Sequence, residues 1–301
     1  MANSFKADIK TIENIIEYYK DLQDETINTN IYFKASCKEF CVIIYSNNTV
    51  FFQGKKAKEE LAKWTILEDE QQSLNLEFSE EIIDDEIDHI GSDEVGCGDY
   101  FGPVVVASCY VKKENYQYLL DIGVKDSKKL TDEKVKELAK LIKDKVQSAT
   151  FILTNKKYNE IHNQNVYNLN KIKAFLHNFV LYKLSTSLNF KGKIVVDQFC
   201  DEKTYYNYLK DYKTKDIQRD ITFTTKAESK YIAVACASII ARDTFLNEIE
   251  KMKEETGYNI LLGANSEVDK LAKKILDEKG IDYLSNYVKL HFKNTEKIKL
   301  M

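Results

Sequence analysis

The stretch "IGSDEVGCGDYFGPVVVASCYV", residues 90–111, indicates how this chain folds. An apolar run leads into two adjacent acids, Asp93 and Glu94, and two glycines follow with a single residue between them. The only proline of the chain then opens a strongly apolar run, which is typical of a buried strand. Adjacent carboxylates followed by a glycine turn predict a functional site where one strand of a sheet ends.

The bulk composition describes an ordinary globular chain. Its 301 residues suggest one or two domains, and 44% of them are hydrophobic. The longest apolar run, 232–241, is much shorter than the ~20 residues of a membrane span, and the start "MANSFKADIK" lacks the apolar core of a secretory signal. The six cysteines are scattered without the spacing of zinc ligands. We therefore expect a reduced cytoplasmic protein with no membrane partner, and we favour a monomer.

The charge of the chain is unevenly distributed. The formal net charge is −4, but residues 68–88 contain ten Asp or Glu and no Lys or Arg. The rest of the chain is therefore net basic, and the excess lies after residue 88. A mildly basic body suits contacts with phosphates, and the acidic segment is the best candidate for a linker.

Residues 1–67 are predicted to form a small α+β domain. Apolar residues at helical spacing indicate a first helix, and alternating or apolar runs indicate strands joined by a turn at Asn47-Asn48. The predicted order is a helix at 7–22, strands at 30–36, 39–46 and 49–54, and a helix at 55–64.

Residues 89–301 are predicted to form a mixed α/β domain in which strands and helices alternate. Beyond the apolar run before Asp93, strands are expected at 103–111, 149–155, 193–199 and 220–229. Helices are expected at 132–146, capped by Thr131 or Asp132, and at 166–188, 231–251, 266–279 and 281–291.

Acids recur at the predicted strand ends. Asp93 and Glu94 follow "HIGS", Asp197 ends "IVV", and Glu228 follows "ITFTTKA". Carboxylate oxygens suit hard divalent cations, and two such ions about 4 Å apart can activate water and stabilise the leaving oxygen of a phosphodiester. A single acid in such a position is more often a helix cap or a solvated turn, so the interpretation depends on the combination.

Asp93 and Glu94 pose a geometric difficulty, because neighbouring residues of a regular strand point to opposite faces. They can share a site only if the strand twists or ends there. Gly96 and Gly98 allow this, since glycine accepts positive φ and lets another backbone approach closely.

The combination of motifs resembles a known family. The segments "SDEVGCGDYFGPVVVASCYV", "VKDSKKLTDEK", "VVDQF", "TKAESKYIAVACASIIAR" and "VKLHFKNTEK" together closely resemble bacterial ribonuclease HIII, in order from about residue 89 to 299. The N-terminal "FFQGKKAKEELA" resembles the substrate-binding domain of that family, which is similar in fold to the TATA-box-binding protein. Ribonuclease HII usually lacks this domain and has an arginine between the two glycines, so Cys97 favours ribonuclease HIII.

The resemblance implies a ribonuclease H-like catalytic domain that cuts the RNA strand of an RNA·DNA hybrid with Mg²⁺ or Mn²⁺, leaving 5′-phosphate and 3′-hydroxyl ends. It implies that the metals are held by Asp93, Glu94, Asp197 and Glu228. A turn formed by Gly96, Cys97 and Gly98 could contact the 2′-hydroxyl, which only an RNA strand presents.

Two lysine-rich segments are candidate substrate contacts. "GVKDSKKL" offers Lys125, Ser127 and Lys128 for phosphates, although it could equally be a solvated loop. "QGKKAKEE" offers Lys55 and Lys56 at a helix N-terminus, although an ordinary basic first turn would read the same.

Two further positions leave questions open. The family's fourth acid falls on Glu228, whereas Asp243 is predicted to be a surface acid on the following helix beside Arg242. His291 is expected on a C-terminal helix, as a structural residue or a phosphate neighbour rather than a catalytic base.

Some departures and alternatives remain. The stretch "LLGANSEVD", 261–269, lacks a proline that the family often has. Ribonuclease HII-like cutting at single ribonucleotides, a catalytically silent hybrid-binding protein, and another metal-dependent phosphotransferase are the alternatives. The N-terminal domain argues against the first alternative, and the four intact acids argue against the second. The lack of a Gly-rich Lys-Ser/Thr loop argues against the third.

Overall fold

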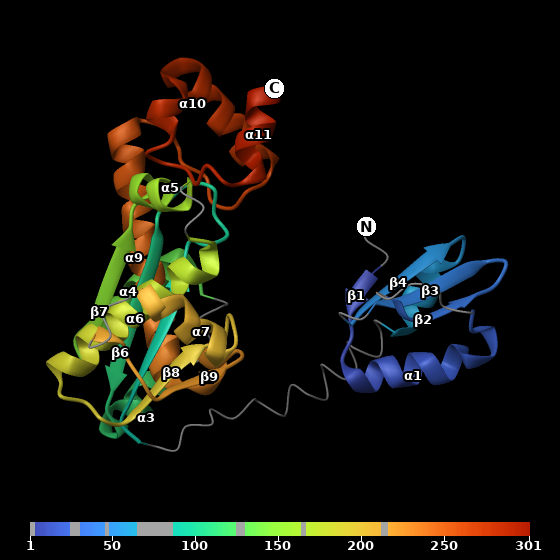
Figure 1. Ribbon diagram of the computed structural model, residues 1–301, viewed down its shortest axis with the longest axis horizontal. Helices are drawn as coiled ribbons and strands as arrows, with labels where there is room; N and C mark the ends of the chain where they lie inside the picture. Colours follow the sequence, from blue (N-terminus) through green and yellow to red (C-terminus); the bar gives the residue numbers. More distant parts are fainter. Residues whose placement is uncertain are drawn as a thin grey trace. The chain divides into compact units, whose positions relative to one another are not determined.

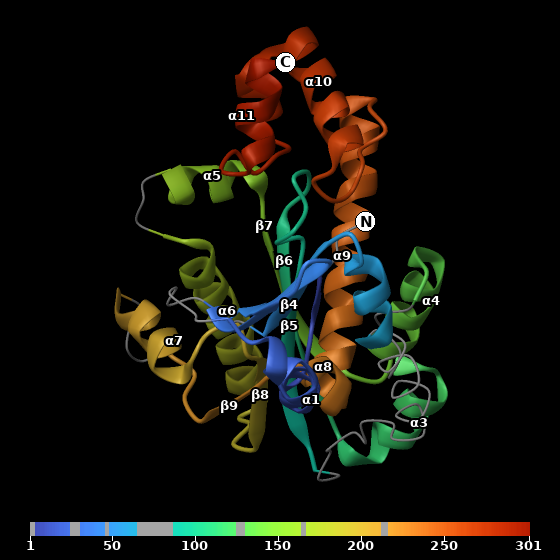
Figure 2. The same ribbon diagram turned by 90° about the vertical axis from the view of Figure 1, so that its right-hand side faces the viewer.

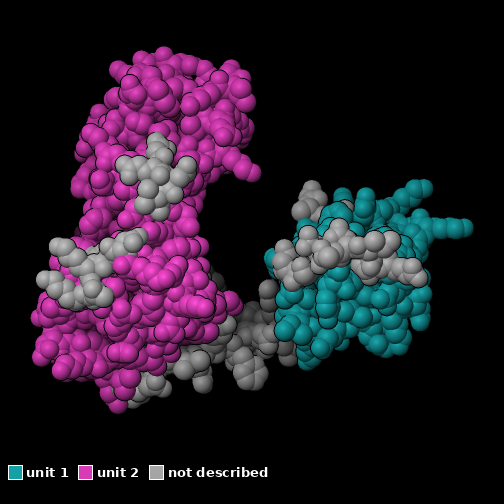
Figure 3. Space-filling model, viewed as in Figure 1, with its two compact units in different colours: residues 1–79 teal, residues 80–301 magenta. Residues whose placement is uncertain are grey.

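The computed structural model divides the chain into two compact units, residues 1–79 and residues 80–301 (Figure 3). Most of the predicted linker, 68–88, falls outside the part of the chain that the structure describes, so the domain boundaries stay a prediction. The described residues are 4–24, 31–45, 48–64, 87–124, 130–163, 167–211 and 216–301. No helix within these ranges has the length and apolar character needed to cross a membrane.

The first unit is a four-stranded antiparallel sheet with a helix packed on one face (Figure 1). The strand order is β1-β4-β3-β2. Asp8 begins the helix by accepting a hydrogen bond from the backbone N–H of Thr11 at 2.7 Å. The elements are β1 (Ser4–Lys6), α1 (Ile9–Tyr19), β2 (Ile31–Ser36), β3 (Phe40–Tyr45) and β4 (Thr49–Gly54), followed by a helix over residues 57–64.

The core of this unit joins both helices to the sheet. The hydroxyl of Tyr19 donates to Glu60 at 2.5 Å and accepts from the indole N–H of Trp64 at 3.1 Å. Both rings pack in one cluster with buried strand residues such as Phe52. The unit therefore has a hydrophobic core of its own. The prediction missed β1, because a three-residue edge strand carries almost no periodic signal.

The second unit is a five-stranded mixed sheet of order β7-β6-β5-β8-β9. The pairs β5–β6 and β6–β7 are antiparallel, whereas β5–β8 and β8–β9 are parallel. The α/β fold expected from the alternating pattern is confirmed. The strands are β5 (His89–Val95), β6 (Val104–Val111), β7 (Gln147–Leu153), β8 (Lys193–Asp197) and β9 (Ile221–Thr224).

Helices cover both faces of this sheet (Figure 2). Strand β6 contributes to the cores on both faces, because alternate residues of a strand point to opposite faces. Val105 and Ala107 pack in the core under α4 and α9. Val104 and Val106 pack in the core under α6. The helices are α3 (Tyr116–Asp121), α4 (Asp132–Lys143), α5 (Asn155–Asn163), α6 (Leu169–Ser187), α7 (Glu202–Tyr208), α8 (Ala227–Lys230), α9 (Ile232–Thr256), α10 (Ser266–Leu284) and α11 (Lys293–Leu300).

Two predictions about the second unit were wrong. The predicted strand 220–229 ends at Thr224, because Lys226 adopts a left-handed backbone with φ of 54° and the one-turn helix α8 follows. The predicted helix 281–291 ends early: α10 kinks at Gly280, where φ is 82°, and stops at Leu284. His291 therefore lies in the loop before α11, where its ring packs against that of His162 with centroids 4.4 Å apart.

Candidate active site

Strand topology brings the predicted acids to one edge of the sheet. Strands β5, β8 and β9 run parallel, so their carboxyl ends meet at the same edge. Ser92 pairs with Val196 in register, and the next residues along the two strands are Asp93 and Asp197. The fourth acid, Glu228, lies on α8, which follows the end of β9. Asp93 and Glu94, which are adjacent on β5, thus lie near the same edge as Asp197 and Glu228 from distant parts of the sequence. Because β5 stays regularly paired through Val95, Asp93 and Glu94 leave the strand on opposite faces.

The turn after β5 depends on its first glycine and on a buried lysine. Gly96 has φ of +93°, and a Cβ atom there would lie 2.2 Å from the carbonyl oxygen of Pro103, so a side chain is excluded. The ammonium of Lys289, which is 1% exposed, donates to the carbonyls of Asp99 at 2.8 Å and Gly102 at 2.5 Å. Burial lowers the pKa of Lys289 to about 8. The sequence prediction missed this lysine.

The other residues of the turn, Cys97 and Gly98, differ in their surroundings. A Cβ atom on Gly98 would meet no atom within 4 Å, so this part of the turn faces open space. Cys97 is half-buried against the core, and burial raises the pKa of its thiol to about 12. The loop "LLGANSEVD" is attached to the same turn, since the N–H of Gly263 donates to the carboxylate of Asp99 at 2.6 Å.

Asp93 is a partly buried acid with neighbouring acids. Burial, the charge of Glu94 and the charge of Asp197 raise its pKa, a hydrogen bond from Ser238 on α9 lowers it, and the resulting pKa is about 7. One oxygen of Asp93 also accepts from the backbone N–H of Glu94 at 2.9 Å. Carboxylates that raise one another's pKa are the arrangement that a bound cation would relieve.

Glu94 has two cationic or donor side chains beside it, and the sequence prediction named neither. Its carboxylate forms an ion pair with Lys173 and accepts from Nε2 of His177 at 2.8 Å. Burial alone would raise the pKa of Glu94, but the interactions with His177 and Lys173 outweigh it and lower the pKa to about 2. Glu94 is therefore ionised at neutral pH.

Asp197 and Glu228 are linked through the start of α8. The carboxylate of Asp197 accepts from the backbone N–H of Ala227 at 2.9 Å, and Ala227 is the residue before Glu228. Glu228 is only 8% exposed. The expectation that Glu228 ends a strand was wrong, although the residue still follows β9 directly.

Asp243 does not lie on the helix surface. It is 7% exposed and pairs with Lys143 of α4 at 2.7 Å. Its sequence neighbour Arg242 pairs with Asp132 instead, at 2.7 Å. The prediction that Asp243 is a surface acid was therefore wrong, because its side chain is buried between α9 and α4, where it pairs with Lys143.

The donor chemistry of the four acids fits a divalent cation. Among the described residues, however, no three His, Cys, Asp or Glu side chains already form a group that could hold a metal ion. The contacts explain this: Glu94 faces Lys173 and His177, and Asp197 faces the N–H of Ala227. Binding of a cation would need some of these contacts to be exchanged for bonds to the metal.

The predicted substrate contacts are only partly described. Lys125, Ser127 and Lys128 lie outside the described residues. Lys55 is exposed, whereas the ammonium of Lys56 pairs with Glu39 at 2.5 Å. Both lysines precede the helix that begins at residue 57, and their roles remain predictions.

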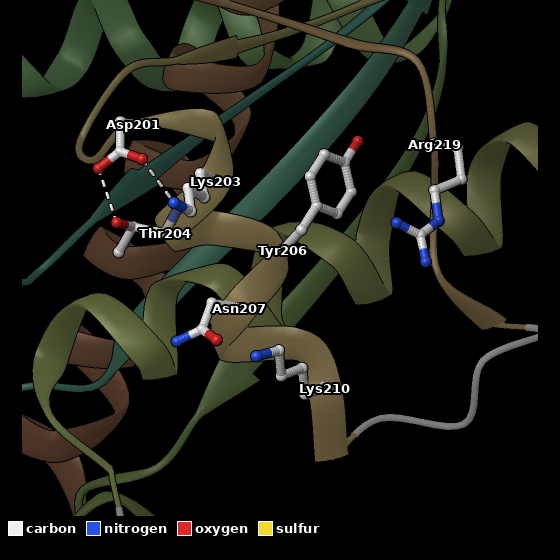
Figure 4. A pocket seen from close by; sticks show the side chains of 7 residues that line it. All are labelled: Asp201, Lys203, Thr204, Tyr206, Asn207, Lys210 and Arg219. Atoms are coloured by element: carbon white, nitrogen blue, oxygen red, sulfur yellow. Dashed lines mark hydrogen bonds between the residues drawn. The ribbon is translucent and has the colours of Figure 1, made fainter.

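A separate hollow of about 860 Å³ lies beside α7 (Figure 4). Its lining includes Lys203, Lys210 and Arg219, and the guanidinium of Arg219 lies 4.9 Å from the ring centre of Tyr206. The four acids do not line this hollow. In the sequence, an acidic residue stands next to each of its three cationic residues. The candidate active site is therefore the group of carboxylates and not this hollow.

The mixed sheet with acids at the ends of its parallel strands defines a ribonuclease H-like enzyme. The family model described as ribonuclease HII matches residues 90–295, and a model described as a domain of unknown function, DUF3378, matches residues 4–75. A ribonuclease HIII of Phytoplasma mali is 38% identical over 98% of this chain and 97% of its own, and one of Streptococcus mutans is 36% identical over 96% and 95%. The chain belongs to the ribonuclease HIII family.

Solved structures agree with this assignment. The crystal structure of Bst-RNase HIII in complex with Mn²⁺ is similar with a TM-score of 0.69 and 32% identity, covering 99% of this chain and 97% of that one. The ribonuclease H2 from Pyrococcus horikoshii OT3 has a TM-score of 0.58 and 27% identity, and covers 71% of this chain and 98% of its own. The predictions of family, fold class and enzyme class are confirmed.

Proposed function

We propose that this ribonuclease is an endonuclease that hydrolyses the RNA strand of RNA·DNA hybrids and leaves 5′-phosphate and 3′-hydroxyl ends. The observation that carries the proposal is the position of the acids in the sheet: Asp93 and Glu94 lie near the carboxyl end of β5, Asp197 ends the parallel strand β8, and Glu228 lies on α8 after β9. Its resemblance to ribonuclease HIII proteins supports the substrate class.

The four acids would hold the divalent cations, and Mg²⁺ or Mn²⁺ suits an all-oxygen set of ligands. When bound, such cations supply the Lewis acidity and the activated water that phosphodiester hydrolysis requires. The Mn²⁺ in the related Bst-RNase HIII structure supports this part of the proposal.

Other residues of the chain would position the substrate. The open space over Gly98 lets a nucleic-acid backbone approach the peptide groups of the turn, and the rigid segment 99–102 below it is fixed by Lys289. The 2′-hydroxyl, as donor and acceptor, is the group by which such a turn could distinguish RNA from DNA. Glu228 is only 8% exposed, so bulk water has little access to this acid.

The direct test compares four labelled duplexes: an RNA·DNA hybrid, RNA·RNA, DNA·DNA, and DNA with one embedded ribonucleotide. Each is incubated with the protein and Mg²⁺, Mn²⁺ or EDTA. We expect cleavage of the hybrid RNA strand with either metal and none with EDTA, and products that a polymerase can extend from a 3′-hydroxyl. Preferred cleavage at the single ribonucleotide would instead support ribonuclease HII-like specificity.

The N-terminal unit is expected to bind the substrate rather than to take part in chemistry. All four acids lie after residue 90, and residues 4–64 have a core of their own. Deleting residues 1–67 should therefore raise the Kd for the hybrid at least about tenfold and change kcat at saturating substrate much less. Binding by filter retention and single-turnover kinetics measure the two effects.

The control for this deletion is Lys55→Ala in the full chain. Because Lys55 is exposed and Lys56 is paired with Glu39, removing the charge of Lys55 should weaken binding by only a part of the effect of the deletion. A truncated protein that is folded and binds the hybrid as tightly as the full chain would rule out a substrate-binding role for this unit.

A further inference from the structure

Both carboxylate oxygens of Glu94 are occupied by side chains from one helix. The ammonium of Lys173 contacts Oε1, and Nε2 of His177 lies 2.8 Å from Oε2. Lys173 and His177 are four residues apart on α6, so they lie on the same face of that helix. The helix thus presents two different groups to one acid of the site.

His177 is fixed in place from several sides. It is fully buried, and its second ring nitrogen, Nδ1, lies 2.8 Å from the hydroxyl of Ser92. Its ring also stacks on Phe199, with centroids 5.4 Å apart. Ser92 and Glu94 are two residues apart on β5, so their side chains leave the strand on the same face. The imidazole therefore bridges two side chains of a single strand.

The direction of the contact with Glu94 follows from its charge. An ionised carboxylate can only accept hydrogen bonds, so Nε2 of His177 carries the proton that it donates. Carboxylates that ligate a metal are usually hydrogen-bonded by a neighbouring side chain. The contact of Nδ1 with Ser92 orients the ring of His177 for such a bond to Glu94.

Lys173 is held less firmly. Its side chain is 12% exposed, and its ammonium lies 4.2 Å from the ring centre of Phe199. A flexible four-carbon stem lets the ammonium move away without disturbing the helix, whereas the buried imidazole has no such freedom. The Oε1 contact is therefore the one that a bound cation can replace.

We propose that His177, oriented by Ser92, is a positioning residue that holds Oε2 of Glu94, and that Lys173 is a counter-ion that gives up Oε1 when a divalent cation binds. The inference rests on the proposed function, in which Glu94 is a metal ligand. It assigns the two side chains opposite effects: His177 favours cation binding, and Lys173 competes with it.

The first test is Mn²⁺ binding without substrate, measured from the electron paramagnetic resonance signal of free Mn²⁺. His177→Asn can reach Ser92 but not Glu94, so Mn²⁺ affinity should fall about tenfold, the lower end of what the loss of such a supporting residue costs. His177→Gln can place its amide N–H near the position of Nε2 and should recover most of that affinity. In hybrid cleavage, His177→Asn should lower kcat and leave KM for the hybrid nearly unchanged.

Lys173→Met provides the opposite case, since methionine keeps most of the apolar stem and removes the charge. Mn²⁺ affinity should rise several-fold, because no ammonium then competes for Oε1. The matched control is His162→Asn, which changes a histidine of α5 that stacks on Tyr158, and Mn²⁺ affinity should stay at the wild-type value. Thermal unfolding without metal shows whether each variant is folded, and Ser92→Ala replaces His177→Asn if that variant does not fold.

Two outcomes would overturn the inference: a folded His177→Asn protein with wild-type Mn²⁺ affinity, or a Lys173→Met protein whose affinity falls as far as that of His177→Asn. The variant Glu94→Gln distinguishes a failure of this inference from a failure of the proposed function. If Glu94→Gln loses Mn²⁺ binding and the wild-type protein cuts the hybrid, only the roles of His177 and Lys173 are refuted. If Glu94→Gln binds Mn²⁺ normally, the assignment of Glu94 as a ligand fails.

Discussion

Asp197→Asn is expected to abolish cleavage of an RNA·DNA hybrid while leaving hybrid binding intact, and Asp93→Asn is expected to do the same. Each change removes one anionic ligand from the edge where β5 and β8 end. The cations supply several kcal/mol of transition-state stabilisation, so kcat should fall by about 1,000-fold or more. Single-turnover cleavage measures the chemical step, and filter retention measures binding. Undiminished turnover by either variant would refute the metal assignment.

A stability measurement distinguishes loss of a ligand from damage to the fold. The folded-state pKa of Asp93 is raised to about 7 by burial and by the neighbouring acids, above the value of 3.8 expected when unfolded. The charged carboxylate therefore costs stability above pH 7, and the cost disappears as the pH falls from about 7 towards 4. With EDTA present, Asp93→Asn should raise the Tm at pH 8 and show a smaller gain at pH 5. A lower Tm at pH 8 would indicate that the asparagine disrupts packing.

The acids on the strands could be predicted from the sequence because their signal is local. An apolar run that leads into an acid indicates a strand end. Asp197 is the last residue of β8, and Asp93 lies two residues before the end of β5, ahead of the glycine pair. The sequence prediction placed Glu228 in a strand because the residues of "ITFTT" favour strand structure, and the predicted strand was continued into "TKAES". The actual break depends on Lys226 in a left-handed conformation, which a non-glycine residue seldom adopts and which no pattern indicates.

The supporting residues were missed for a different reason. In the sequence, His177 is one polar residue inside a long helix, and nothing local shows that it faces Glu94, 83 residues earlier. The sequence prediction assigned no role to Lys289, and lysine is seldom fully buried. It is buried because two backbone carbonyls of the glycine turn accept its hydrogen bonds. Such contacts arise only after distant segments pack together.

The two candidates for the fourth ligand should respond differently to removal of their charge. Glu228 is buried on α8, and the N–H of the preceding residue, Ala227, is bonded to the carboxylate of Asp197. This backbone bond keeps Glu228 next to a predicted ligand. Glu228→Gln should therefore lose nearly all cleavage, by about 100-fold or more in kcat, because one ligand of several is worth at least a few kcal/mol. Its Tm should change little.

Asp243→Asn is the matched acid-to-amide change on the neighbouring helix, and it should keep most of the activity. The carboxylate of Asp243 forms an ion pair with the ammonium of Lys143 on α4 at 2.7 Å, so it stabilises the contact between α4 and α9. Because the side chain of Lys143 is 45% exposed, breaking the pair should cost only about 1 kcal/mol of unfolding free energy. Cleavage rates and thermal unfolding of both variants, measured side by side, decide between the candidates. If Asp243→Asn lost activity and Glu228→Gln kept it, the fourth ligand would belong to α9, because the α8 acid would then be dispensable at the edge where β5, β8 and β9 end.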